Sequence, residues 1–252
     1  MIVGIVALIT AIFLGGSTDE YFLITDIDKA SKEIVVDKQR SQEIIKIIKK
    51  EKKTADSFYK TRSKNLSKFK KGYLNYELKK EDLLGFYETQ IQSVTEHQDL
   101  VFNTRLACIQ HIEAEEWDEI LKLSQERFDK QLAKEQKKLA KQKKEVWDII
   151  NDKVDAVVTD SKNNKAVKQE IEILKRSLLK LDDSLSKRNV KDSETIKNYK
   201  VSFDELKAIG TNNNELRTNA FASLVIFREQ VKNRVDEKQW QAIMKTIDKT
   251  LL

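Results

Sequence analysis

Apolar positions recur at helical spacing through the first quarter of the chain. Between residues 27 and 58 they are separated by intervals close to three, four and seven, as on one face of a long amphipathic helix. We expect this first helix to begin near Thr25 or Asp26, since short polar side chains cap helices, and to break near Gly72. The apolar positions are Ile27, Ile34, Ile44, Ile48, Ala55 and Phe58.

A second helix is predicted from about Lys80 to Ile112, again with apolar residues at helical intervals. Two long helices joined by a short break form an antiparallel hairpin. The residues available for burial on the second helix are Leu83, Phe86, Ile91, Val94, Val101, Leu106 and Ile109.

One short sequence motif, which we call the repeated phrase, occurs twice in the chain. "HIEAEEWDEILK" starts at residue 111 and "RVDEKQWQAIMK" at residue 234, 123 residues later. When the whole sequence is shifted by 123 residues, the apolar pattern stays in register without gaps. This predicts a tandem duplication of one helical unit. The most informative matched residues are Asn75, Tyr76, Arg105 and Trp117 in the first copy and Asn198, Tyr199, Arg228 and Trp240 in the second.

The repeated phrase predicts the start of a third helix in each copy, and in the second copy this helix is short. Asp236 and Gln239 have the spacing of a capping box, which would start this helix in the second copy. Trp240 would then lie on an apolar face with Ile243 and Met244, and the first copy has Trp117 at the matching place. We expect both tryptophans to fold back and close their hairpins, and the eight matched residues to be structural anchors. The alternative is that the tryptophans bind a ligand or lie at a membrane interface.

The expected fold is therefore all-α and elongated, with two tandem helical-hairpin repeats at residues 18–124 and 146–252. A basic connecting helix at 125–145 would join them, as part of one continuous helix from about Ala114 to Val157. Within the second repeat, the polar run at 211–214, after Gly210, is expected to interrupt the helix as a loop.

Composition supports long helices. The 252 residues include no proline and only six glycines, so the chain lacks the residues that most often form tight turns. Charged residues make up 35% of the chain, which also fits disorder, but the net charge is only +6 and the apolar spacing favours a folded protein. Cys108 is the single cysteine, so no disulfide can form within one chain; we interpret it as a small buried residue.

The N-terminal segment predicts export. Residues 2–14 are apolar except for one threonine, and Gly15, Gly16 and Ser17 follow. This length is typical of the apolar region of a signal peptide and is short for a membrane span, although no basic residue precedes it. We interpret residues 1–17 as a signal peptide or an anchor, with a buried helix of the core as the alternative. Four acidic residues then precede the first lysine: Asp19, Glu20, Asp26 and Asp28. Since cytoplasmic flanks normally carry an excess of Lys and Arg, this favours an exported, periplasmic or extracytoplasmic location, with residues 1–16 as the tether.

The sequence offers no catalytic or cofactor site. His97 and His111 are the only histidines, and no second cysteine is present to complete a zinc site. The Glu-x-x-His pairs of di-iron bundles, the Gly-x-Ser-x-Gly elbow and the Gly-Lys-Ser/Thr phosphate loop are also missing. We therefore expect a protein that is not an enzyme and has no metal or other cofactor.

Two basic stretches are the strongest functional signal. One lies between residues 46 and 71 and the other between 130 and 144. They could be solvated helix faces, or they could meet anionic lipid headgroups or nucleic-acid phosphates. Nucleic acid is disfavoured if the chain is exported. The candidate basic surface consists of Lys46, Lys49, Lys50, Lys52, Lys53, Lys130, Lys134, Lys137, Lys138, Lys141, Lys143 and Lys144.

Three functional hypotheses follow from these features. The favoured one is a non-enzymatic, exported or membrane-tethered helical protein that acts through contacts with another protein. The second is a helical protein that binds or inserts into a membrane surface with its apolar N-terminus and basic helices. The third is an intracellular nucleic-acid-binding or scaffold protein. The seven-residue spacing suits self-association and packing within one chain equally well, so the pattern leaves the oligomeric state open.

Overall fold

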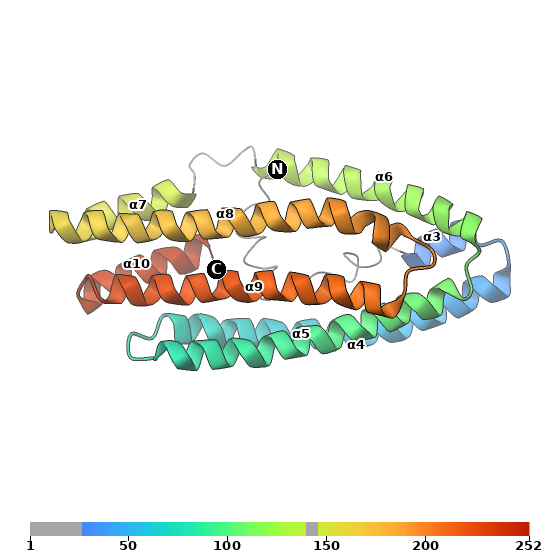
Figure 1. Ribbon diagram of the computed structural model, residues 1–252, viewed down its shortest axis with the longest axis horizontal. Helices are drawn as coiled ribbons and strands as arrows, with labels where there is room; N and C mark the ends of the chain where they lie inside the picture. Colours follow the sequence, from blue (N-terminus) through green and yellow to red (C-terminus); the bar gives the residue numbers. More distant parts are fainter. Residues whose placement is uncertain (1–26, 140–145, 252) are drawn as a thin grey trace.

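The computed structural model describes residues 27–139 and 146–251, and every regular element in these ranges is a helix. The prediction of an all-α fold is confirmed for this part of the chain. The long helices run along the long axis of an elongated bundle, with the shorter ones at its two ends (Figure 1). The elements are α3 (Ile27–Ile34), α4 (Lys38–Tyr73), α5 (Lys80–Ile109), α6 (Ala114–Leu139), α7 (Val146–Val157), α8 (Ser161–Lys197), α9 (Phe203–Lys232) and α10 (Glu237–Thr250).

Four long helices form the body of the bundle. A short turn connects α4 to α5, and another connects α8 to α9, so each pair lies antiparallel (Figure 1). The two pairs meet through α5 and α9, while α6 packs on α3 and α10 packs on α7. The helices α5 and α9 thus lie at the centre of the molecule.

The expected single first helix is wrong, because the chain breaks between α3 and α4. Asp37 adopts an extended conformation, and its side chain accepts a hydrogen bond from the backbone N–H of Arg40 at 2.9 Å. This contact satisfies one of the orphan donors at the start of α4 and so favours a new helix there. Asp160 caps α8 in the same way, with the backbone N–H of Asn163 at 2.8 Å.

The capping box at the start of α10 is confirmed. The Asp236 side chain accepts from the Gln239 backbone N–H at 2.8 Å, and the Gln239 side chain accepts from the Asp236 backbone N–H at 3.2 Å. At the start of α6, the Glu116 carboxylate accepts from the Glu113 backbone N–H at 2.9 Å. Both α6 and α10 therefore begin where the repeated phrase places their first residues.

The expected loop at residues 211–214 is also wrong, because α9 continues through it. Asn214 is buried, and its side-chain amide donates to the side-chain oxygens of Gln98 at 2.7 Å and Thr95 at 3.1 Å on α5. These contacts between helices outweigh the weak helix preference of asparagine. Gly210 is close to α5 as well: a Cβ there would lie 3.1 Å from Cζ of Phe102.

The buried apolar residues form two clusters, and each cluster combines residues from both sides of position 140. Phe69 and Tyr73 share one cluster with Phe221 and Trp240. The other cluster brings Trp117 together with residues that include Ile44, Phe102, Ile196 and Leu206. Each core is therefore built mainly from one side of the chain and completed by residues from the other.

Some predictions fall outside the described residues. The apolar segment at 1–17 lies there entirely, as do residues 140–145 of the expected continuous helix between Ala114 and Val157; on either side, α6 ends at Leu139 and α7 begins at Val146. Within the described ranges, no helix combines the length and the apolar character that crossing a membrane requires.

Candidate functional site

The eight predicted anchors lie in two joints, and each joint connects helices that precede position 140 with helices that follow it. We call these two sets of helices the two sides of the bundle. The first joint consists of Arg105, Trp117, Ile196, Asn198 and Tyr199. The Arg105 guanidinium is buried, lies 4.9 Å from the ring centroid of Trp117, and donates to the backbone carbonyls of Ile196 and Asn198, the latter at 3.3 Å. An arginine on α5 thereby holds the turn between α8 and α9.

Two further hydrogen bonds close the first joint. The indole N–H of Trp117 donates to the backbone carbonyl of Lys197 at 2.7 Å, and the Tyr199 hydroxyl donates to that of Ile112 at 2.6 Å. Burial lowers the pKa of Arg105 to about 10. The site is therefore a closed one, in which the guanidinium faces backbone oxygens.

The second joint consists of Arg228, Trp240, Tyr73, Asn75 and Tyr76. Arg228 is buried, lies 5.1 Å from the ring centroid of Trp240, and donates to the backbone carbonyls of Tyr73 at 3.0 Å, Asn75 and, at 3.0 Å, Leu78. Tyr76 packs edge-on against Trp240 with 5.2 Å between ring centroids. An arginine on α9 thereby holds the turn between α4 and α5.

The asparagines shape the two turns in the same manner. The Asn75 side-chain oxygen accepts from the Glu77 backbone N–H at 3.1 Å, and that of Asn198 accepts from the Lys200 backbone N–H at 2.9 Å. Such side-chain-to-backbone bonds stabilise tight turns. In each joint the asparagine presents its own backbone carbonyl to the arginine on the other side of the bundle.

His97 and Cys108, two of the titratable groups singled out by sequence, are buried. His97 stacks on Phe58 with 4.0 Å between ring centroids, and burial, reinforced by the charge of Arg62, lowers its pKa to about 4. Burial, together with Glu51, raises the pKa of Cys108 to about 12. No cluster of three or more potential metal ligands occurs among the described residues.

Sequence reasoning missed an ion pair that ties α4 to the start of α6. The Arg40 guanidinium meets the Glu116 carboxylate in a two-point contact at 2.7 and 2.9 Å, and it lies 3.2 Å from a carboxylate oxygen of Glu113. Arg40 has no basic counterpart in the second copy, because the matched position, 123 residues later, holds Asn163. Only the capping position of Glu116 could have pointed to it.

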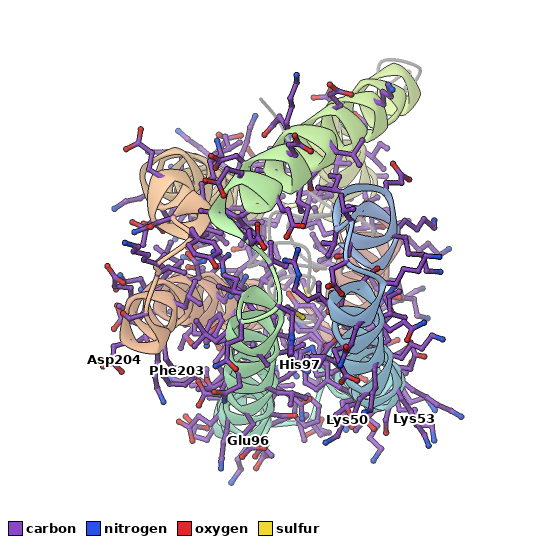
Figure 2. The ribbon with its side chains drawn as sticks, turned by 90° about the vertical axis from the view of Figure 1, so that its right-hand side faces the viewer. Lys50, Lys53, Glu96, His97, Phe203 and Asp204 are labelled. Atoms are coloured by element: carbon purple, nitrogen blue, oxygen red, sulfur yellow. The ribbon has the colours of Figure 1, made fainter. Side chains whose placement is uncertain are left out.

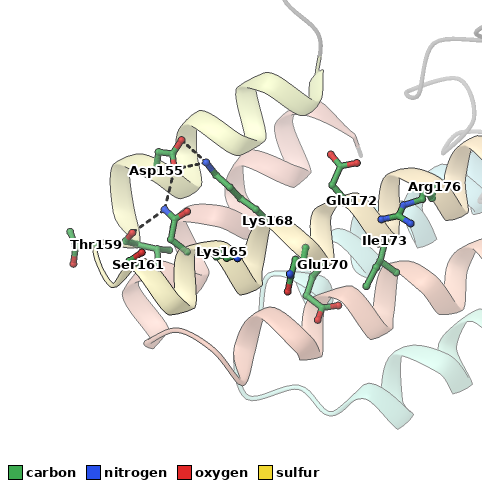
Figure 3. Close-up of a pocket in the computed structure, with 12 residues that line it drawn as sticks. Asp155, Thr159, Ser161, Lys165, Lys168, Glu170, Glu172, Ile173 and Arg176 are labelled. Carbon is green, nitrogen blue, oxygen red and sulfur yellow. Dashed lines mark hydrogen bonds and ion pairs between the residues drawn. The ribbon is translucent and has the colours of Figure 1, made fainter.

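An open groove of about 1090 Å³ runs along α7 and α8 (Figure 3). At one end, Lys168 pairs with Asp155 at 2.6 Å and Asn164 donates to the same carboxylate at 3.0 Å. The hydrogen bond from Lys168 holds the pKa of Asp155 below its usual value. Further along, Ile173 leaves 56% of its surface exposed beside Arg176.

The predicted basic surface is only partly described. Lys46, Lys49, Lys50, Lys52 and Lys53 are all exposed on α4. Figure 2 shows Lys50 and Lys53 on the outer side of that helix, while His97 lies between α4 and α5. Lys130 is exposed on α6. The side chains of Lys134, Lys137 and Lys138, and the whole of Lys141, Lys143 and Lys144, fall outside the described part of the chain.

Comparison of the chain with protein-family models, with curated proteins and with solved structures found no match. Inferences about function therefore depend on the surfaces of this molecule.

Proposed function

We propose that this chain is a non-enzymatic helical protein, exported or tethered to a membrane through residues 1–16, which acts by contacting another protein. The groove along α7 and α8 is the proposed contact surface. Its lining carries three basic side chains (Lys165, Lys168 and Arg176) and three acidic ones (Asp155, Glu170 and Glu172), so its formal charges balance.

The exposed apolar residue is the observation that carries this proposal. Ile173 is more than half exposed in a long groove whose charges cancel, an arrangement that suits a polypeptide better than a polyanion. Two of the acids already have partners, since Asp155 pairs with Lys168 and Glu170 pairs with Arg234 at 2.6 Å. A partner segment with one apolar side chain flanked by polar ones would complement this surface.

We further propose that the scaffold behind the groove consists of two tandem helical-hairpin repeats, at residues 18–124 and 146–252. Helix starts support it: α4 and α8 begin at residues 38 and 161, α5 and α9 at 80 and 203, and α6 and α10 at 114 and 237, a difference of 123 each time. The two joints support it too, because Ile196 and Asn198 lie 123 residues after Tyr73 and Asn75, and each pair offers its carbonyls to the matched arginine.

The contact surface is tested by replacing Ile173 with aspartate. Covalent cross-linking in the native cells, followed by purification of the tagged chain, should recover a partner with the wild type and lose it with Ile173→Asp. Ile226→Asp is the matched control, because Ile226 is 53% exposed on α9, away from the groove. The proposed contact is wrong if both variants keep the partner or both lose it.

Location is tested separately, by N-terminal sequencing of the native protein and by cell fractionation. Export predicts a new N-terminus after residue 15, 16 or 17, and tethering predicts an intact chain in the membrane fraction. An intact chain in the cytosolic fraction would reject both.

A further inference from the structure

The outer face of α4 carries a row of lysines. At 3.6 residues per turn, eight of them fall within a sector of about 100° of the helix, and they extend over roughly 38 Å of its length. All eight are exposed. We call them the α4 stripe: Lys46, Lys49, Lys50, Lys53, Lys60, Lys64, Lys68 and Lys71.

Acidic residues barely offset this charge. All three acids of α4 lie outside the sector. Glu43 lies about 20° beyond one edge and 3.5 Å from Lys46, whereas Asp56 lies about 20° beyond the other edge, between Lys53 and Lys60 in the sequence. The third acid, Glu51, is buried on the opposite face. Among the described residues, none forms an ion pair with the other seven lysines of the stripe. The row therefore presents a nearly uncompensated positive charge.

This arrangement works against the helix that carries it. Like charges three or four residues apart repel one another on a helix surface, and the stripe contains successive pairs of this kind, from Lys46 and Lys50 to Lys64 and Lys68. The buried face of α4, with Ile44, Ile48 and Phe69, maintains the helix despite the repulsion. An anionic partner laid along the row would relieve it.

The corresponding face of α8 is different. The positions 123 residues after the stripe hold three basic and three acidic residues. The row of lysines is therefore found on α4 and is not repeated at the matched positions of α8. These positions are Gln169, Glu172, Ile173, Arg176, Asp183, Lys187, Lys191 and Glu194.

We propose that the α4 stripe is a docking surface for anionic lipid headgroups, with α4 lying along the plane of a bilayer. The proposal goes beyond the protein contact proposed above and does not depend on it. Lysines near an anionic membrane surface each add to its attraction, and a straight row can meet a planar surface along its whole length. Because the apolar face of α4 is buried in the bundle, the helix would rest on the headgroups without inserting.

The composition of the stripe favours lipid over nucleic acid. The sector of α4 that carries the stripe contains no arginine, the residue whose planar fork recognises phosphates and guanine edges at two points. It also contains no aromatic residue, whereas single-stranded nucleic acids are bound by stacking on such rings. Flexible, hydrated ammonium groups suit a fluid array of headgroups that imposes no fixed geometry.

The test measures binding of the full chain to vesicles by co-sedimentation. Vesicles of phosphatidylcholine alone are compared with vesicles that also contain phosphatidylglycerol, at low and high salt. We expect binding to the anionic vesicles that weakens as salt rises. A variant with Lys50, Lys53, Lys60 and Lys64 changed to glutamine should bind them at least about 100-fold more weakly. Equal binding to the two vesicle types at both salt concentrations would overturn the proposal.

A control variant removes the same charge elsewhere. Lys162, Lys238, Lys245 and Lys249 are exposed outside α4, and changing all four to glutamine should leave vesicle binding within about threefold of the wild type. Circular dichroism and thermal unfolding verify that both variants are folded. Equal loss in the two variants would overturn the proposal, as would binding to duplex DNA or to an acidic polypeptide without binding to anionic vesicles.

Discussion

The two joints contain the same matched residue types yet close in different ways. In the first joint, the indole N–H of Trp117 donates across the bundle to Lys197, whereas in the second the indole N–H of Trp240 donates at 3.3 Å to the carbonyl of Arg228 on its own side. The residue after the arginine differs too: Glu229 forms an ion pair with Arg228, while Leu106 follows Arg105. One joint thus relies on backbone carbonyls across the bundle, and the other adds a carboxylate.

The difference shows which parts of this arrangement are indispensable. Arginine over tryptophan, and a turn that offers two carbonyls, are common to both joints. The indole partner and the acid vary. We infer that the hydrogen bonds from the guanidinium to the turn define the joint. Substitutions of each group measure its contribution to stability separately from those of the indole partner and the acid.

The largest effects are expected from the tryptophans. Trp117→Ala and Trp240→Ala should each lower the free energy of unfolding by about 3–5 kcal/mol, because each removes a fully buried indole from a core. Urea unfolding followed by circular dichroism measures it, and Ile226→Ala, at an exposed position, should change it by less than about 0.5 kcal/mol. Phenylalanine sharpens the comparison: Trp117→Phe should cost more than Trp240→Phe, because its shorter hydrogen bond spans the bundle.

The arginines come next. Arg228→Met should cost about 3–4 kcal/mol and Arg105→Met about 2–3 kcal/mol, since both leave buried carbonyls without their donors but only the first strands a carboxylate. The same urea experiment measures this. Adding Glu229→Leu to Arg228→Met should restore about 1 kcal/mol, because it removes the stranded charge. Equal losses for the two arginines would show that Glu229 contributes nothing.

The free energy of unfolding should change with pH by roughly 2–3 kcal/mol because of a histidine that only the first half of the molecule contains at this place in the repeat. Position 97 holds histidine, and position 220, 123 residues later, holds alanine. The pKa of His97 is about 4 in the folded chain, against 6.5 for a histidine in water, so between these two pH values the unfolded chain binds a proton that the folded chain does not. As far as His97 is concerned, the free energy of unfolding is therefore highest above pH 6.5 and decreases as the pH falls towards 4.

Unfolding titrations between about pH 7 and pH 4 measure this slope. His97→Ala, which copies the second half, should flatten it. Carboxylates with lowered pKa values, such as Asp37 and Glu205, lose their contributions at lower pH and so leave the window largely to His97. A slope that persists in the variant would contradict the assignment.

The smallest effects are expected in the turns. Asn75→Ala and Asn198→Ala should each cost about 1 kcal/mol, because each removes one side-chain hydrogen bond to the turn backbone. Asn219 is exposed within α9, so Asn219→Ala should have no cost, as alanine favours a helix. Clearly unequal losses at the two turns would show that the joints differ in this shared part as well.

Local pattern predicted much of this structure. The start of α10 at Glu237 depends on the capping box of Asp236 and Gln239, two neighbours within one turn that the sequence displays directly. The break before Lys38 was missed because Val35 and Val36 continue the apolar run, and only the capping role of Asp37 ends it.

Contacts between distant elements could not be predicted in the same way. Asn214 lies in a helix because Gln98 and Thr95 meet its side chain, and nothing near position 214 announces them. The matched residues raised a second difficulty: a repeat makes Asn75 and Asn198 equivalent, so the pattern cannot say which turn Arg105 holds. The structure assigns each arginine to the turn from the opposite side of the bundle.

This crossed closure has a consequence for synthesis on the ribosome. When only the first 139 residues have emerged, Arg105 and Trp117 exist, but the turn that covers them has not been made. The other core waits longer, since Phe69 and Tyr73 share it with Trp240 and Leu251. We therefore expect the nascent chain to keep part of its apolar surface exposed until translation is nearly finished, and to need protection from aggregation during that interval.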